Sequence, residues 1–112
     1  MTVALPTSAQ ILEALVKLGE TSDDVAEALQ QRGIRGVKGM ARCCPLANYL
    51  KKEFPAVTGL GVTPYYVRVD VGNSGESVYS HISESASEFV DRFDKGSFQG
   101  LTITYEELGR IA

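Results

Sequence analysis

Residues 65–82 read YYVRVDVGNSGESVYSHI, and this stretch decides the class of the fold. The run 65–71 alternates apolar and polar residues from Val67 onward, the run 76–82 again contains β-branched and aromatic residues, and the turn-forming residues 72–75 lie between the two runs. Alternation with a period of two is typical of strands that bury one face, because successive side chains point to opposite sides of a sheet. Two such runs around a short turn that contains Gly and Asn predict an antiparallel β-hairpin.

A turn centred on Asn73 and Ser74 sets which residues pair across this hairpin, since a shift of one position would exchange the two faces. One face is predicted to enter the core with the pairs Val69–Val78 and Tyr65–Ile82. The other, called the mixed face, carries the pairs Arg68–Tyr79 and Tyr66–His81. We therefore expect one apolar side and one side that combines aromatic rings with charges.

Three segments upstream of the hairpin have apolar residues at helical spacing. The first, 8–18, follows a threonine and contains a glutamine at the spacing of a capping box. The second, 22–32, is expected to use Ser22 as its cap and to end at a glycine. The third, 45–54, begins with a proline, whose missing amide proton does no harm at a helix start, and another proline follows it.

One further helix and a short strand are predicted downstream of the hairpin. Ser85 and Glu88 have the spacing of a capping box and predict a helix that ends at Gly96. Alternating apolar residues over 101–105 predict a short edge strand, and capping-box spacing at 104–107 predicts a terminal helical turn after it. The predicted class is therefore α+β, with three helices, a hairpin, a helix and a short terminal strand and helix.

The length of the chain, 112 residues, predicts a single domain, 1–112, because it suffices for one buried core but not for two. No long apolar run is present in the sequence, so we expect neither a signal peptide nor a membrane span, and a cytoplasmic location. The two cysteines, Cys43 and Cys44, are adjacent and poorly placed to bridge each other, which fits a reducing compartment.

Charge is segregated along the sequence. Residues 28–52, called the basic segment, hold six basic residues and none of the 14 acidic ones, although the whole chain has a net charge of −3. A surface formed by this segment is expected to attract anions. Within it, 34–43 has two glycines and little periodicity, so it is predicted to be a loop of about ten residues. Loops of this length often carry function.

We interpret the basic segment and the mixed face as a candidate binding surface for an anionic partner, with nucleic acid among the candidates. Its predicted residues are Arg32, Arg35, Lys38, Arg42, Asn48, Lys51, Lys52, Tyr66, Arg68 and Tyr79. The cations would contact phosphates and the rings would contact bases. The alternative is that these cations are solvated or pair with the acidic residues at helix starts.

The order of three helices and a hairpin is similar to that of a winged helix-turn-helix domain. In such a domain 45–54 would be the recognition helix, and Asn48, Lys51 and Lys52 would face the groove. The connection before it is about ten residues long, whereas the usual turn has about three or four. The spacing therefore argues against this class.

A thiol enzyme is a second hypothesis. Cys44 lies at a predicted helix start, where unpaired amides and the macrodipole favour a thiolate, and His81 is the only histidine and would be the base. The alternatives are a buried, inert thiol and an ordinary cross-strand histidine. No third residue that would orient the imidazole can be identified, so binding is favoured over catalysis. Two cysteines and a histidine are too few for a closed zinc site, and neither a metal nor a cofactor is expected.

Two short motifs, Gly-Ile-Arg-Gly at 33–36 and Cys-Pro-Leu-Ala-Asn-Tyr-Leu at 44–50, resemble a segment of small uncharacterised actinobacterial and phage-type proteins. The resemblance covers less than a third of the chain. It implies a bacterial or phage setting and no known activity.

The sequence therefore predicts a small cytoplasmic α+β protein that binds or regulates an anionic partner through the basic loop and the start of the third helix. A cysteine-dependent enzyme that uses Cys44 and His81, and a protein–protein adaptor that uses the same loop, stay open as alternatives. The sequence sets neither the oligomeric state nor the identity of the partner.

Overall fold

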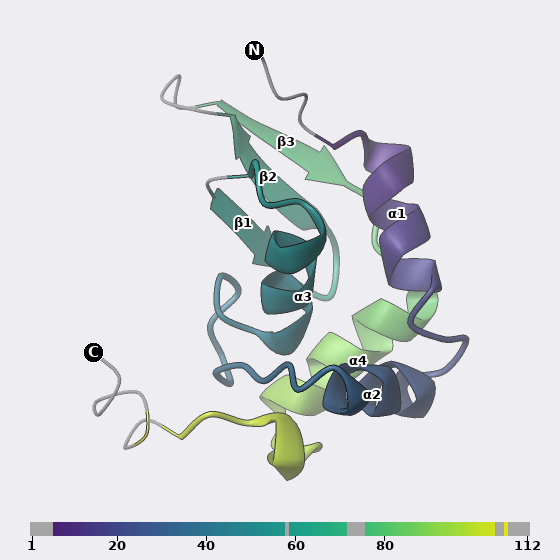
Figure 1. Ribbon diagram of the computed structural model, residues 1–112, viewed down its shortest axis with the longest axis vertical. Helices are drawn as coiled ribbons and strands as arrows, with labels where there is room; N and C mark the ends of the chain where they lie inside the picture. The colour runs from purple at the N-terminus through teal and green to yellow at the C-terminus, as the bar shows by residue number, and fades with distance from the viewer. Residues whose placement is uncertain (1–5, 58, 72–75, 105–106, 108–112) are drawn as a thin grey trace.

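The computed structural model describes residues 6–57, 59–71, 76–104 and 107. Within these ranges the elements are α1 (Ser8–Val16), α2 (Ser22–Gln31), α3 (Pro45–Glu53), β1 (Gly59–Val62), β2 (Val67–Val71), β3 (Glu76–Ser80), α4 (Glu84–Asp94) and the 3-10 helix η1 (Gln99–Leu101). Helices and antiparallel strands occupy separate parts of the chain, so the predicted α+β class is confirmed (Figure 1). None of the described helices has both the length and the apolar content needed to cross a membrane.

The sheet has the order β1–β2–β3 and is antiparallel throughout. The predicted hairpin register is confirmed, since Arg68 pairs with Tyr79 and Val69 pairs with Val78. The turn that joins these strands, 72–75, lies outside the described residues. β1 was not predicted, because its two glycines are typical of a turn rather than of a strand interior.

The ladder of β2 and β3 is shorter than expected at the end away from this turn. The predicted pairs Tyr65–Ile82 and Tyr66–His81 lie beyond it and are wrong. The reason is the tight turn between β1 and β2, in which the Thr63 amide donates to the Tyr66 carbonyl over 3.0 Å. Tyr65, predicted to be in the core, lies in this turn and is 83% exposed.

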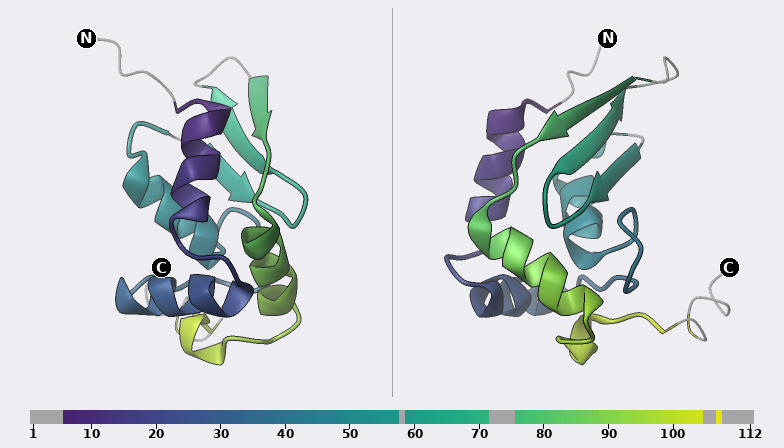
Figure 2. Two further views of the ribbon diagram at one scale, coloured as in Figure 1. Left: turned by 90° about the vertical axis from the view of Figure 1, so that its right-hand side faces the viewer. Right: turned by 180° about the vertical axis from the view of Figure 1, so that it is seen from behind.

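Helices cover one face of the sheet. α1 packs along β3 and α3 along β1, whereas α2 and α4 pack against each other beyond one end of the sheet (Figures 1 and 2). Seen from behind, the opposite face of the sheet has no described helix across it (Figure 2, right). The mixed face predicted from the sequence is this uncovered face.

The core lies between the sheet and the helices. Its largest fully buried side chains are Phe89, Phe93, Ile11, Leu15, Leu29, Leu46, Leu50, Leu60, Val25, Val62, Val67 and Val90. Val78 was predicted to join them but is 48% exposed. The buried position on β3 belongs to Ser80, whose hydroxyl lies 2.9 Å from the Ser8 hydroxyl at the start of α1.

The capping box before α1 is confirmed, and two other predicted caps are wrong. Thr21, not Ser22, caps α2, and Ser22 is buried against α4. Ser83, not Ser85, caps α4, because the Ser85 hydroxyl donates to the Gly19 carbonyl over 3.0 Å instead. In both cases a serine near the helix start makes a tertiary hydrogen bond that local sequence does not reveal.

The predicted strand over 101–105 is wrong in the part that the structure describes. Leu101 ends η1, and Thr102 forms a single parallel bridge to Gly36. Both hydrogen bonds of the predicted terminal capping box are present: the Glu107 amide donates to the Thr104 hydroxyl (3.1 Å), and the Thr104 amide donates to the Glu107 carboxylate (3.5 Å). The rest of the predicted terminal helix lies outside the described residues.

Candidate binding surface

The loop between α2 and α3 is hydrogen-bonded through its backbone to the segment after η1. The Gly36 amide donates to the Leu101 carbonyl (2.8 Å), and the Ile103 amide donates to the Gly36 carbonyl (2.7 Å). A Cβ atom at Gly36 would overlap backbone atoms of Cys44 and Pro45. A residue without a side chain is therefore required here, and the loop is a fixed part of the fold.

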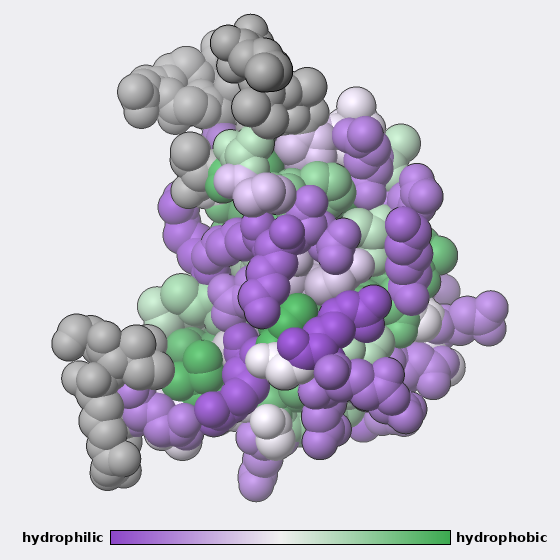
Figure 3. All heavy atoms as spheres, viewed as in Figure 1, coloured by the Kyte–Doolittle hydropathy of each residue, from purple (hydrophilic) through white to green (hydrophobic). Residues whose placement is uncertain are grey.

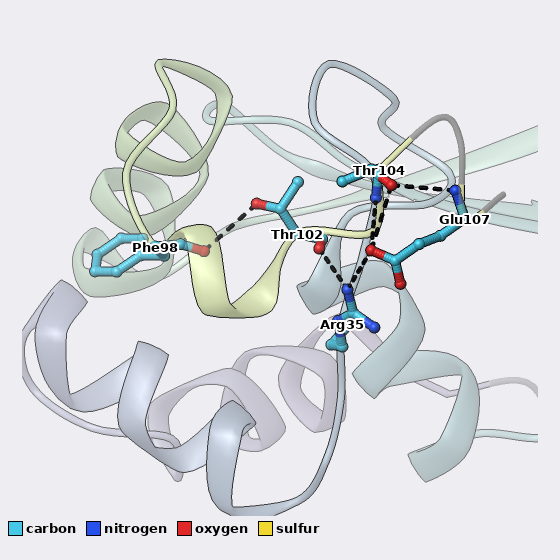
Figure 4. Close-up of polar contacts among 5 residues, drawn as sticks. All are labelled: Arg35, Phe98, Thr102, Thr104 and Glu107. Carbon is cyan, nitrogen blue, oxygen red and sulfur yellow. Dashed lines mark hydrogen bonds and ion pairs between the residues drawn. The ribbon is translucent and has the colours of Figure 1, made fainter.

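Arg35 is a predicted binding residue whose charge is already paired with an acidic residue of the same chain. Figure 4 shows its guanidinium reaching from the loop after α2 to the segment after η1, where it donates to the Thr102 carbonyl (2.7 Å) and the Glu107 carboxylate (3.0 Å). The hydrogen bond from Arg35, together with the Thr104 amide and the charge of Arg35, lowers the pKa of the Glu107 carboxyl below its usual range. Arg35 thus joins two segments of the fold.

The outer side of α3 offers fewer polar groups than predicted. The side-chain amide of Asn48 donates to the Arg35 carbonyl over 2.7 Å and to a second loop carbonyl over 3.3 Å. The Lys51 ammonium donates to the Arg42 carbonyl. Both side chains border a surface depression, as the prediction that they face outward requires, but each also donates to a carbonyl group of the loop.

Three other predicted cations lie on separate parts of the surface. Lys52 borders a shallow depression of about 430 Å³ that Arg35, Asn48 and Lys51 also line, whereas Lys38 borders another hollow beside Gln99. Arg32 lies over the Tyr49 ring, 5.7 Å from its centroid. Hydrophilic side chains gather over α2 and most of α3 on the face drawn in Figure 3. The ten predicted residues therefore do not form one continuous surface.

Four predicted residues do come together on the uncovered face of the sheet. Arg68 and Tyr79 are cross-strand partners on β2 and β3. The Tyr66 ring meets the Tyr79 ring edge to face, with centroids 5.0 Å apart and planes at 75°. Arg42 reaches the same face from the loop before α3. We call this surface the tyrosine–arginine face; it consists of Arg42, Tyr66, Arg68, Asp70, Ser77 and Tyr79.

The glycines of β1 keep this face free of side chains beside Asp70 and Arg42. A Cβ atom at Gly59 would overlap the Asp70 carboxylate, whereas one at Gly61 would make an ordinary contact of 3.7 Å with the Arg42 side chain. A hollow of about 110 Å³ opens between the loop and the strands, with Tyr66 and Asp70 in its lining. The side of β1 that faces this hollow thus carries hydrogen atoms where a neighbouring strand carries side chains.

Asp70 is the centre of the polar contacts on the face. Its carboxylate accepts hydrogen bonds from Arg42 (3.0 Å), from Arg68 (3.2 Å) and from the Ser77 hydroxyl (3.0 Å). The Ser77 hydrogen bond, followed by the two arginines, lowers the pKa of the Asp70 carboxyl. Sequence reasoning missed Asp70 and Ser77, although the predicted register places them directly opposite each other, as they are in the ladder.

Positive charge exceeds negative charge on this surface. Arg42 and Arg68 share one carboxylate, and their side chains are 61% and 46% exposed. Exposed ion pairs contribute little to stability, so another anion can compete with Asp70 for these guanidinium groups.

Cys44 and His81 lie in different surroundings. Cys44 caps α3, and its sulfur accepts a hydrogen bond from the Ala47 amide at 3.4 Å. Burial raises the pKa of the Cys44 thiol to about 11, because the amides at the helix start lower it by less than desolvation raises it. The buried thiol corresponds to the inert alternative given above. His81 is exposed and follows β3, whose last residue contacts α1. In the described part of the chain no hydrogen bond links His81 to Cys44.

Comparison with protein-family models, with curated proteins and with solved structures finds no match for this chain. The resemblance of 33–36 and 44–50 to actinobacterial and phage-type proteins stays a prediction. Function is therefore argued from the geometry of the tyrosine–arginine face.

Proposed function

We propose that this protein binds an anionic polymer, with nucleic acid among the candidates, and that the tyrosine–arginine face is the surface that binds it. The observation that supports this most is that Arg42 and Arg68 converge on the single carboxylate of Asp70 while both stay open to solvent. Arg42 is the one residue of the basic segment in the proposed site. The other binding residues lie on the strands of the sheet rather than in the loop.

The arrangement favours exchange of one anion for another. Each guanidinium already has an oxygen partner at hydrogen-bonding distance, so its geometry suits a carboxylate or a phosphate. A phosphate that approaches this face meets two guanidinium groups and one carboxylate. The net attraction is modest for one phosphate, and it grows when a polymer contacts several cations together.

Other predicted cations offer less support for a binding role. Arg35 is held by Glu107, and Lys51 and Asn48 donate to loop carbonyls. These contacts also weigh against α3 as a recognition helix, because a helix in a DNA groove needs its polar side chains free to contact bases.

Inorganic polyphosphate is the probe that tests this proposal, because it carries phosphate charge and no bases. Titration calorimetry at two salt concentrations is expected to show binding that weakens as salt rises. Arg42→Ala and Arg68→Ala are each expected to weaken binding, since each removes one phosphate contact. Each is also expected to make the slope of log K against log salt concentration shallower by about one unit.

Lys95→Ala supplies the matched control. Lys95 is an exposed cation that pairs with Asp91 on α4 at 3.0 Å, away from the sheet. The variant changes the net charge as the arginine variants do, and it is expected to bind as the wild type does. Equal weakening in all three variants, or no binding of polyphosphate at low salt, would overturn the proposal.

The two alternatives predicted from the sequence have less support. A thiol enzyme needs a reactive Cys44 beside a base, and this thiol is buried with a raised pKa. A protein–protein adaptor would bind a folded partner without a strong salt dependence. A cytoplasmic location in a bacterial or phage setting remains an expectation and adds no support to either.

A further inference from the structure

We infer that the anionic polymer is single-stranded nucleic acid, whose unpaired bases stack on Tyr79 and Tyr66 while Arg42 and Arg68 hold its phosphates. This inference rests on the proposed function and names the ligand class of the same site. The reason is the presence of two exposed tyrosines, because a site that binds only phosphate charge has no need of aromatic rings.

The two rings offer stacking surfaces at the uncovered side of the sheet. Tyr79 is 59% exposed although it lies within a strand, and Tyr66 is partly exposed beside it. Their planes are inclined at 75°, so the edge of one ring lies against a face of the other, and a base would stack on a face that this contact leaves exposed. Every base has a flat aromatic face, so such a platform binds without a preference for one sequence.

Rings and cations form a row across the strands. Tyr79 on β3 pairs with Arg68 on β2, and Arg42 lies over β1 on the far side of Arg68. Neighbouring strands are about 4.8 Å apart, so the Tyr79 ring lies about one strand spacing from Arg68 and about two spacings, roughly 10 Å, from Arg42. A single strand of nucleic acid presents its bases and its phosphates side by side in the same way.

A duplex fits these observations poorly. In a duplex each base face is covered by its neighbours, so a protein ring cannot stack on it without separating the bases. The structure also lacks a free recognition helix in its described part, because Asn48 and Lys51 of α3 donate to loop carbonyls. Unpaired bases are therefore the chemistry that suits Tyr66 and Tyr79.

Fluorescence anisotropy with a labelled oligothymidine of about 12 nucleotides, within the usual range of such sites, tests the inference. We expect Tyr79→Ala to weaken this binding by about 5- to 150-fold, the loss usual for one stacked base, and to weaken polyphosphate binding much less, because polyphosphate has no base to stack. Tyr79→Phe is expected to bind as the wild type does, because the ring is retained. An unlabelled duplex of the same length is expected to compete weakly.

Tyr65→Ala is the matched control for loss of an exposed tyrosine. Tyr65 lies in the turn between β1 and β2, outside the tyrosine–arginine face, so its removal is expected to leave oligothymidine binding unchanged. Thermal unfolding of both alanine variants checks that they fold, which the exposure of these two side chains favours.

The outcomes separate this inference from the proposed function. If polyphosphate binds but Tyr79→Ala leaves oligothymidine binding unchanged, or the duplex competes as well as the single strand, the inference is wrong and the proposed function stands. If neither polyphosphate nor oligothymidine binds, both the inference and the proposed function are wrong. Selective loss of oligothymidine binding in Tyr79→Ala supports both.

Discussion

Arg35 and Glu107 are 72 positions apart in the sequence, and their side chains meet at 3.0 Å. The contact joins the loop after α2 to the segment after η1, alongside the backbone hydrogen bonds of Gly36. Both partners are partly exposed, so the ion pair mainly sets where the segment lies rather than adding much stability. A residue predicted to bind an external anion is thus already bound to an internal one.

Acidification is expected to weaken this contact. The pKa of the Glu107 carboxyl is lowered in the folded protein, so the pair stabilises the fold above the ordinary glutamate pKa, and this contribution is lost as pH falls through the lowered value. The Glu107→Gln variant cannot form the ion pair, so it lacks this contribution to stability at every pH. Urea unfolding across this acid range should therefore show the difference between wild type and variant shrinking as pH falls.

A double-mutant cycle assigns the effect to Arg35. Once Arg35→Gln has removed the partner, Glu107→Gln is expected to change stability much less, because the two residues are in direct contact. A pH-dependent difference that persists in the Arg35→Gln background would show that Glu107 acts through another group.

Thiol labelling is expected to distinguish the two cysteines. Cys44 is buried with a pKa of about 11, so at pH 8 roughly a thousandth of it is thiolate, whereas Cys43 is only half-buried. Iodoacetamide followed by mass spectrometry should modify Cys43 first, and Cys44 should react at a comparable rate only after unfolding in guanidinium. Faster native-state labelling of Cys44 would revive the thiol-enzyme hypothesis.

Gly36→Ala is expected to be severely destabilising. An added methyl group would overlap the backbone at Cys44 and Pro45, which cannot move without shifting the start of α3. We expect a loss of about 3 kcal/mol or more from overpacking against fixed atoms. Gly100→Ala is the control, because a Cβ atom there meets nothing within 4 Å. Urea midpoints of the two variants measure the difference.

Asp70→Asn is expected to strengthen binding of polyphosphate. The change removes the negative charge that competes for Arg42 and Arg68, which bond to different oxygens of the carboxylate, and keeps an acceptor oxygen for only one of them. Titration calorimetry against the wild type checks this. Weaker binding in Asp70→Asn would mean that the charge of Asp70 is needed to orient the two guanidinium groups.

Local patterns predicted much of the fold. The capping box of α1, the start of α3 at Pro45 and the hairpin register depend on residues near one another in sequence, and all three are confirmed. β1 was missed because strand formation at Gly59 and Gly61 depends on pairing with β2 rather than on local preference. The predicted caps at Ser22 and Ser85 failed for the same kind of reason, since tertiary partners take up these hydroxyls.

The candidate site could be predicted only in part. The pairing of Arg68 with Tyr79 follows from strand alternation and was predicted. Which cations have internal partners could not be predicted, because Arg35 meets Glu107 and Arg42 meets Asp70 only once the chain has folded. Positive charge in the sequence was therefore a poor guide to positive charge available on the surface.

Mapping of amide chemical shifts by NMR during titration with oligothymidine tests the central claim most directly, because it locates binding residue by residue. The account predicts that the largest changes fall on Arg42, on 66–70 and on 77–80, with little change along the outer side of α3. Changes centred instead on α3 and on the loop at 33–38 would contradict it.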